Sequence, residues 1–161
     1  MIKTCSIIGH REIEITESLK ETIRKNVLRL IRNKGVSTFL FGSKGQFNSL
    51  CYDIITEIKV DYPNIKRIYI RAEYPFISKD YLDYLREFYE DSIYFDKNGN
   101  SSKLNYIKRN EYMINHSEYC LFYFDNNYTP KTKTKSGTAI AYNYAIKNNK
   151  EIINIKNGLV T

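Results

Sequence analysis

The sequence lacks any segment of the kind that anchors a protein in a membrane or directs it to export. No apolar stretch approaches the roughly 20 residues that a membrane-spanning helix needs. The apolar start of the chain, Met1–Ile8, is short, and the charged residues after Gly9 interrupt it too soon for a signal peptide. We therefore expect a cytoplasmic protein with no membrane partner.

Cysteine and histidine are scarce, with three cysteines and two histidines in 161 residues. Cys5, Cys51 and Cys120 have no metal-like spacing and lie in apolar surroundings, which predicts reduced thiols in the core. We expect no metal site and no cofactor. Internal repeats, coiled-coil patterns and linker-like segments are missing too, and the length suits a single domain over residues 1–161.

The charge is basic, since 25 lysines and arginines outnumber 18 aspartates and glutamates for a formal net charge of +7. A basic balance favours an anionic partner. It does not separate a nucleotide from a nucleic acid, or either from simple solubility.

Apolar periodicity predicts strands and helices in alternation along the chain. Thr16 and Ser78 are expected to cap helices, Gly35 to end one, and Ile15 and Phe88 to lie on buried helix faces. The predicted strands cover Thr4–Ile8, Ser37–Phe41, Lys66–Ala72, Ser92–Phe95, Tyr119–Phe124 and Glu151–Ile155. The predicted helices cover Ile15–Lys34, Ser49–Tyr62, Ser78 to about Glu90, Ser102 or Lys103 to near His116, and Gly137–Asn148.

This alternation predicts an α/β fold of three layers, in which helices cover both faces of a mostly parallel sheet. Ligands of such folds bind outside the carboxyl ends of the strands. Three unusual loops follow strands here, and they should open at the same edge. They are Gly9-His10-Arg11, the segment 42–47, and the long segment 125–135 that leads to Ser136-Gly137-Thr138.

The tripeptide Ser136-Gly137-Thr138 opens a predicted helix and is the strongest indication of a site. The first N–H groups of a helix are free to face an anion, and the helix dipole adds positive potential there. Such a tripeptide is also an ordinary N-cap. The hypothesis is therefore a phosphate pocket, and the alternative is a plain helix start.

The turn Gly9-His10-Arg11 offers close backbone approach, an imidazole and a guanidinium fork that suits phosphate. Its alternative interpretation is a solvated turn with two basic side chains. The segment Gly42-Ser43-Lys44-Gly45 could form a second anion-binding nest or a simple strand-to-helix turn, with Asn48 or Ser49 as the N-cap. It does not match the P-loop pattern, so a P-loop NTPase is not expected.

Two further residues are candidates for the same edge. Arg109 lies in the predicted helix just before the apolar strand Tyr119–Phe124. Its side chain could reach back over the ligand, or it could be a surface arginine. Asp125 follows that strand and could meet a ribose hydroxyl or start a turn. Residues 128–135 are long and polar enough for a lid over the pocket.

Together these segments resemble the SLOG superfamily, the Rossmann-like group that includes the Lonely Guy (LOG) enzymes and the DNA-processing protein DprA. The small bacterial branch related to YpsA is the most similar. The resemblance rests on the order of five segments, Ile7–Arg11, Gly42–Gly45, Arg109–Met113, Cys120–Phe124 and Ser136–Thr138. It implies a modified Rossmann-like fold and a site for nucleotides or nucleotide-derived molecules.

The LOG enzymes cleave the N-glycosidic bond of nucleoside monophosphates with a Gly-Gly-x-Gly-Thr-x-x-Glu loop and an arginine in the preceding helix. Gly137, Thr138 and Arg109 match parts of this pattern, but Ala141 stands where the glutamate is expected. Another carboxylate would have to replace it in catalysis. The candidates are Glu73, Asp125 and Glu12.

Three functions follow from this resemblance. The first is a sensor or sequestering protein for a nucleotide or an NAD- or ADP-ribose-like ligand, of the kind found in antiphage and nucleotide-signalling systems. The second is a LOG-like nucleotide N-glycosidase with a relocated carboxylate. The third, supported only by charge, is a DprA-like binder of single-stranded DNA. We also expect a homo-oligomer, because related domains pair through helices.

Overall fold

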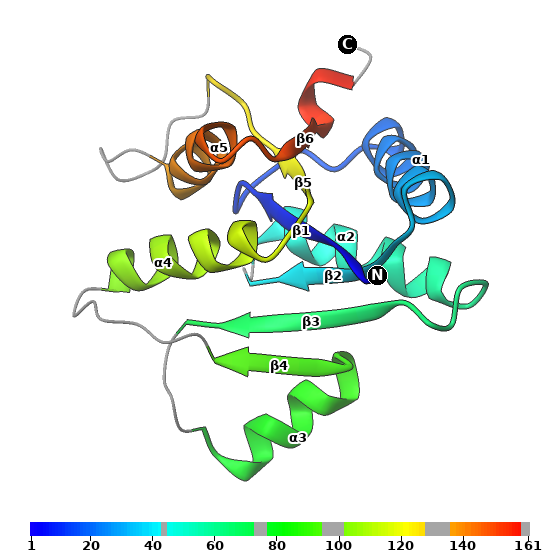
Figure 1. Cartoon of the computed structure of the whole chain (residues 1–161), viewed down its shortest axis with the longest axis vertical. Coiled ribbons are helices and arrows are strands. Elements are labelled where there is room, and N and C mark those ends of the chain that lie inside the picture. Colours follow the sequence, from blue (N-terminus) through cyan, green and yellow to red (C-terminus); the bar gives the residue numbers. More distant parts are fainter. Residues whose placement is uncertain (43–44, 73–76, 95–101, 128–135, 159–161) are drawn as a thin grey trace.

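The computed structural model describes residues 1–42, 45–72, 77–94, 102–127 and 136–158 of the chain. Strands and helices alternate along it (Figure 1). The strands are β1 (Lys3–Gly9), β2 (Val36–Phe41), β3 (Lys66–Arg71), β4 (Asp91–Tyr94), β5 (Tyr119–Tyr123) and β6 (Glu151–Asn154). The helices are α1 (Glu17–Lys34), α2 (Gln46–Lys59), α3 (Lys79–Phe88), α4 (Ser102–Asn115) and α5 (Gly137–Lys147), followed by the 3₁₀ turn η1 (Ile155–Gly158).

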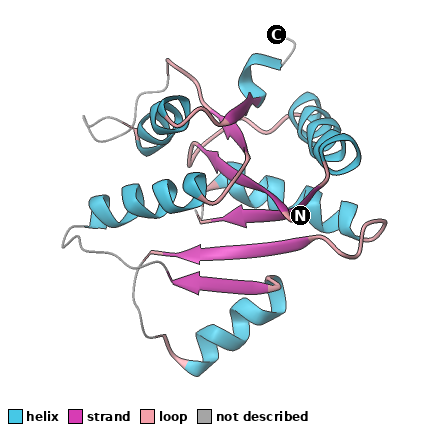
Figure 2. Ribbon diagram, in the orientation of Figure 1, coloured by secondary structure: helices cyan, strands magenta, loops and turns pink. Residues whose placement is uncertain are grey.

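The six strands form one sheet in the order β4-β3-β2-β1-β5-β6. All five neighbouring pairs are parallel, and β2, β3 and β4 point the same way in Figure 2. β1 therefore lies in the interior of the sheet, with β2 on one side and β5 on the other. The predicted α/β class and the parallel sheet are confirmed.

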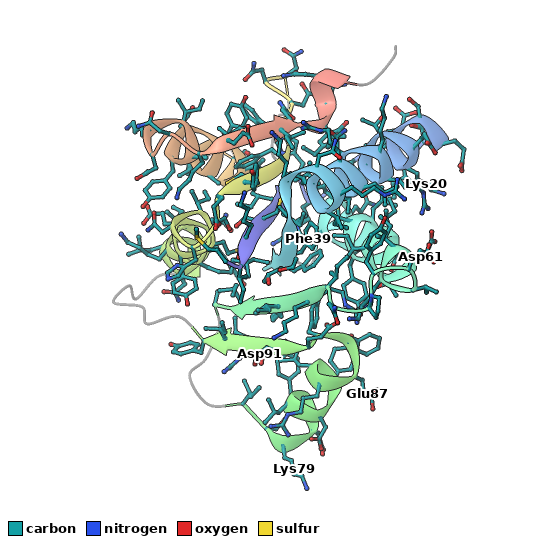
Figure 3. All side chains as sticks on the ribbon, turned by 45° about the vertical axis from the view of Figure 1, so that its right-hand side comes forward. Lys20, Phe39, Asp61, Lys79, Glu87 and Asp91 are labelled. Carbon is teal, nitrogen blue, oxygen red and sulfur yellow. The ribbon has the colours of Figure 1, made fainter. Side chains whose placement is uncertain are left out.

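Alternate residues of each strand serve opposite faces, because side chains in a strand point up and down in turn. One face packs on α1, α2 and α3 around Cys5, Ile7 and Phe39, and Figure 3 shows Phe39 deep between the elements. The other face packs on α4 and α5 around Ile8, Leu40 and Phe122. Both faces are covered, which confirms the three layers.

Local capping explains where several helices begin and end. The Thr16 hydroxyl accepts a hydrogen bond from the Leu19 N–H at 3.1 Å, and Gly35 ends α1 in the left-handed conformation at φ 75°. The Ser78 hydroxyl caps α3 in the same way through the Tyr81 N–H. These caps were predicted and are confirmed.

Three local predictions were wrong. Ile15 precedes the cap of α1 and is 45% exposed. Phe88 is 38% exposed because α3 lies at the margin of the sheet, where it contacts the edge strand β4. Helix α2 begins at Gln46 after Gly45 rather than at Ser49, because the backbone carbonyl of Arg11 accepts the Gln46 N–H at 2.8 Å and replaces a side-chain cap.

Gly9 and Gly42 are sites of close packing on opposite faces of the sheet. A Cβ atom on Gly9 would overlap the ring of Phe47, a fully buried residue in the first turn of α2. A Cβ on Gly42 would lie 2.8 Å from Cδ of Arg109 and 2.9 Å from Sδ of Met113, both in α4. Each glycine therefore lets a helix approach the carboxyl end of a strand.

Two further expectations concern membranes and thiols. Among the described ranges, no helix is long and apolar enough to cross a bilayer. Cys5, Cys51 and Cys120 are buried free thiols, and burial raises the pKa of all three. The prediction of reduced core cysteines is confirmed.

The substitution Gly9→Ala should destabilise the fold by about 1–3 kcal/mol, the usual cost of overpacking a core. The added methyl group would press on Phe47, which is surrounded on all sides. Urea unfolding of Gly9→Ala and of the double variant Gly9→Ala/Phe47→Leu measures this, and the second substitution should restore part of the loss. Gly137→Ala is the matched control, because a Cβ there meets nothing within 4 Å. Equal stability of the two single alanine variants would contradict the packing role of Gly9.

Candidate functional site

The strand order places the topological switch point of the sheet between β1 and β5, and we call the edge outside the carboxyl ends of these two strands the β1–β5 crevice. The chain runs from β1 outward through β2, β3 and β4, and then crosses back to β5 on the other side of β1. Connections that leave two neighbouring strands in opposite directions open a crevice outside their carboxyl ends, where ligands of open α/β sheets bind. Gly9 and His10 follow β1 at this point, and Phe124 and Asp125 follow β5.

His10 joins the two sides of this crevice. Its Nε2 atom accepts a hydrogen bond from the backbone N–H of Asp125 at 2.9 Å, although 115 residues separate the two in sequence. The side chain is only 2% exposed, and its ring centroid lies 6.1 Å from that of Tyr123 and 6.0 Å from that of Phe124. Because the backbone N–H can only donate, we assign the proton of the neutral imidazole to Nδ1.

Burial lowers the pKa of His10, and the nearby carboxylate of Asp125 opposes this shift only in part. The imidazole is therefore neutral near pH 7. The interpretation of this turn as two solvated basic side chains is wrong for His10, which is buried, whereas the side chain of Arg11 is exposed.

The segment after β1 lies against the start of α2. The Arg11 carbonyl accepts the Gln46 N–H at 2.8 Å, and the Ile13 N–H donates to Oε1 of Gln46 at 2.7 Å. This backbone carbonyl already occupies the first N–H of α2. The start of α2 is thus less open to an anion than the sequence suggested, and Ser43 and Lys44 of the predicted nest lie outside the described residues.

The start of α5 is different. The Ser136 hydroxyl accepts the Ala139 N–H at 3.1 Å, and the Ser136 carbonyl accepts the Ile140 N–H at 3.1 Å. No atom of the described residues accepts a hydrogen bond from the N–H of Gly137 or Thr138. Gly137 is exposed and a Cβ there would meet open space. The predicted N-cap is confirmed, and within the described part of the chain the N–H groups of Gly137 and Thr138 have no acceptor.

Arg109 is a buried arginine rather than a surface one, with 6% of its area exposed. It donates from Nη1 to the carbonyl of Gly42, at the carboxyl end of β2. Nε and Nη2 lie 3.3 and 3.2 Å from Oδ1 of Asn110, and the guanidinium lies 5.1 Å from the ring centroid of Tyr106. The surface alternative was wrong, and the charge of Arg109 stands one strand away from the β1–β5 crevice.

Asn154 is a site residue that sequence reasoning missed. From the end of β6, its Oδ1 accepts the Phe124 N–H and its Nδ2 donates to the Phe124 carbonyl, each at 3.0 Å. The available signal was an amide side chain inside the apolar run Ile152-Ile153-Asn154-Ile155. Asp125 follows, half-buried, and its Oδ1 accepts the Asn127 N–H at 2.9 Å, so it does start a turn.

The structure thus brings Gly9, His10 and Asp125 to one crevice. Helix α5, which begins at Gly137 and Thr138, contacts both β1 and β5. Gly42 and Arg109 lie beside these residues at the end of β2. Glu73, a candidate catalytic residue, lies outside the described residues, and Ala141 is buried in the core between α5 and the sheet. Within the described ranges, no group of three or more His, Cys, Asp or Glu side chains could hold a metal ion.

A parallel sheet in this order, helices on both faces and a crevice between β1 and β5 define a Rossmann-like α/β protein. A family model named YpsA, described as the YspA SLOG family, matches residues 6–158. The chain therefore belongs to this SLOG family, as its motifs predicted.

One solved structure of similar fold is the molybdenum cofactor carrier protein MCP from Chlamydomonas reinhardtii, with a TM-score of 0.51 and 13% sequence identity. The match covers 94% of this chain and 75% of that one. At this identity the likeness shows the fold alone. No curated protein matches the chain.

The buried His10 should make folding stability depend on pH. Its pKa is usually about 6.5 in an unfolded chain and lower in the folded one. As pH falls below about 6.5, the unfolded chain binds a proton that the folded chain does not, so the free energy of unfolding decreases.

The variant His10→Gln keeps an acceptor near the position of Nε2 and is neutral at every pH. Urea unfolding from about pH 5 to about pH 8, around the range in which histidine titrates, should give a smaller acid-induced loss for this variant than for the wild type. Parallel pH profiles for the two proteins would show that His10 does not titrate differently on folding.

Proposed function

We propose that this chain binds a nucleotide or a nucleotide-derived molecule, such as an NAD- or ADP-ribose-like compound, and acts as a sensor or sequestering protein. The observation that carries the proposal is the open start of α5 beside the β1–β5 crevice. Two N–H donors, of Gly137 and Thr138, and the positive end of the helix dipole suit a phosphate group. Membership of the SLOG family supports the same ligand class.

In this proposal, other side chains at the edge recognise the rest of the ligand. The exposed guanidinium of Arg11 supplies charge from the β1 side, and the half-buried Asp125 carboxylate accepts from a ribose hydroxyl. Gly9, His10, Gly42, Ser136 and Arg109 shape the edge. A protein of similar fold is named as a carrier of the molybdenum cofactor, which supports small-molecule binding as a role for this architecture.

A thermal-shift panel at fixed salt tests the ligand class. It contains nucleoside monophosphates, ADP-ribose and its cyclic forms, NAD, cyclic nucleotides, inorganic phosphate and single-stranded DNA. A ligand at 100 times its dissociation constant stabilises the fold by about 2.7 kcal/mol, which is readily detected. A shift with DNA alone, falling steeply as salt rises, would support the nucleic-acid alternative instead.

The substitution Gly137→Pro removes one proposed phosphate donor with little change to the helix. Proline suits the first position of a helix, and Ser136 has the extended conformation (φ −62°, ψ 140°) that proline requires before it. Calorimetric titration with the compound that shifts in the panel should show binding weakened by about 1.5–3 kcal/mol, the range for a hydrogen bond to a charged group. Gly137→Ala keeps the N–H and should keep most of the affinity. If the proline variant binds as tightly as the wild type, the phosphate does not lie at α5.

A second candidate function is a nucleotide N-glycosidase, favoured by the position of Asp125 at the crevice. Ala141 is buried and has no carboxylate. Of the two candidate carboxylates that the structure describes, Glu12 is exposed, whereas Asp125 is half-buried at the end of β5, and we take Asp125 as the residue that would assist cleavage. Product analysis after incubation with nucleoside monophosphates decides between binding and turnover. If the protein is a glycosidase, Asp125→Asn should abolish release of the free base while binding persists. If it is a sensor, neither the wild type nor the variant releases the base.

We also propose that the protein acts as a homo-oligomer. Helix α3 supports this, because Tyr84 and Phe88 are 54% and 38% exposed and their ring centroids lie 4.7 Å apart. An exposed aromatic pair of this kind is suited to contact with a second copy. Light scattering at working concentration should give a mass above that of one chain, and a monomer mass would contradict it.

A further inference from the structure

The carboxyl end of β5 is held by side chains after its backbone pairing stops. The last paired residues are Gly9 with Tyr123 on the β1 side and Asn154 with Phe122 on the β6 side. Beyond them, the Asn154 amide accepts a hydrogen bond from the Phe124 N–H and donates one to the Phe124 carbonyl. Nε2 of His10 accepts a hydrogen bond from the Asp125 N–H. Three successive backbone groups just beyond the end of β5 are therefore hydrogen-bonded to the side chain of Asn154, at the end of β6, and to that of His10, which follows β1.

These two side chains are poor candidates for direct ligand contact. Both are neutral, since Asn154 carries no charge and burial keeps His10 unprotonated near pH 7. The oxygen and one N–H of the Asn154 amide are hydrogen-bonded to Phe124, and Nε2 of His10 is hydrogen-bonded to the Asp125 N–H. His10 is also nearly inaccessible. Their geometry suits holding a backbone in place rather than binding a phosphate.

Phe124 connects this arrangement to α5. Its ring centroid lies 4.7 Å from that of Tyr142 in α5 and 6.0 Å from that of His10. A shift of the Phe124 backbone would move this contact and the helix that carries Gly137 and Thr138. A site built this way is preorganised, because the groups that bind are set by groups that do not touch the ligand.

We propose that His10 and Asn154 are a pair of positioning residues that hold the end of β5, and through Phe124 and Tyr142 the start of α5, in the arrangement that binds ligand. This proposal rests on the proposed function for its ligand. Its structural part, the hold on residues 124–125, can be tested without one.

The ligand-free experiment follows amide hydrogen exchange by NMR in His10→Leu, Asn154→Leu and His10→Gln. The two leucine variants should speed exchange at the Phe124 and Asp125 amides and shift the amide resonances of Gly137 and Thr138. His10→Gln retains an acceptor and should resemble the wild type. Asn26→Leu is the matched control, because it removes a side-chain amide bond, to the Thr22 carbonyl within α1, away from the crevice. Unchanged exchange at residues 124 and 125 in both leucine variants would overturn the proposal.

The binding experiment uses inorganic phosphate as the probe and titrates the amides of Gly137 and Thr138. His10→Leu and Asn154→Leu should each weaken binding about two- to tenfold, a change of the size of an ordinary hydrogen bond, whereas His10→Gln should keep most of the affinity. Faster exchange with unchanged phosphate affinity would overturn the positioning role. If phosphate perturbs neither amide in the wild type, the proposed ligand site fails, while the exchange experiment still decides whether the pair holds β5.

Discussion

The pairing of β1 with β5 is the interaction on which the rest of the molecule depends. It brings two segments more than a hundred residues apart into register from Cys5 with Tyr119 to Gly9 with Tyr123. Because β1 also pairs with β2, this contact places β1 in the interior of the sheet. The chain then leaves β1 toward β2 and leaves β5 toward β6, on opposite sides of the β1–β5 pair. The crevice at the carboxyl ends is a consequence of that order, and so is the meeting of His10 with Asp125.

Three glycines at this edge have different physical roles. Gly9 and Gly42 are packing positions, where Phe47 and Arg109 occupy the space that a Cβ would need. Gly137 borders open space at the start of α5. A glycine in a loop after a strand can therefore report either a helix that approaches closely or a backbone left accessible to a ligand. The second kind is the one on which the proposed ligand site depends, and no described residue accepts a hydrogen bond from the N–H of Gly137 or Thr138.

Burial decides which basic side chains at this edge can present positive charge to solvent. His10 is neutral because its ring is removed from water, so it contributes geometry and no positive charge near pH 7. Arg109 keeps its charge in a buried position and uses it on the Gly42 carbonyl. The exposed Arg11 and the dipole of α5 remain as sources of positive potential toward solvent.

The sequence by itself determined the order of the elements, the parallel sheet and the caps at Thr16, Ser78 and Ser136. These features depend on apolar periodicity and on residues within three or four positions of each other. The positions of the motif residues along the chain also predicted the family correctly. Where a long-range contact replaced a local one, as the Arg11 carbonyl does at the start of α2, the predicted boundary was wrong by a few residues.

Only the tertiary structure decided the roles of the individual side chains. It buried His10 and Arg109, both of which could equally have been solvated, and it made Asn154 part of the edge. The deciding contacts join residues 30, 67 and 115 positions apart, as in Asn154 with Phe124, Arg109 with Gly42, and His10 with Asp125. No local pattern encodes such contacts, because they exist only once the sheet has set which strand ends are neighbours.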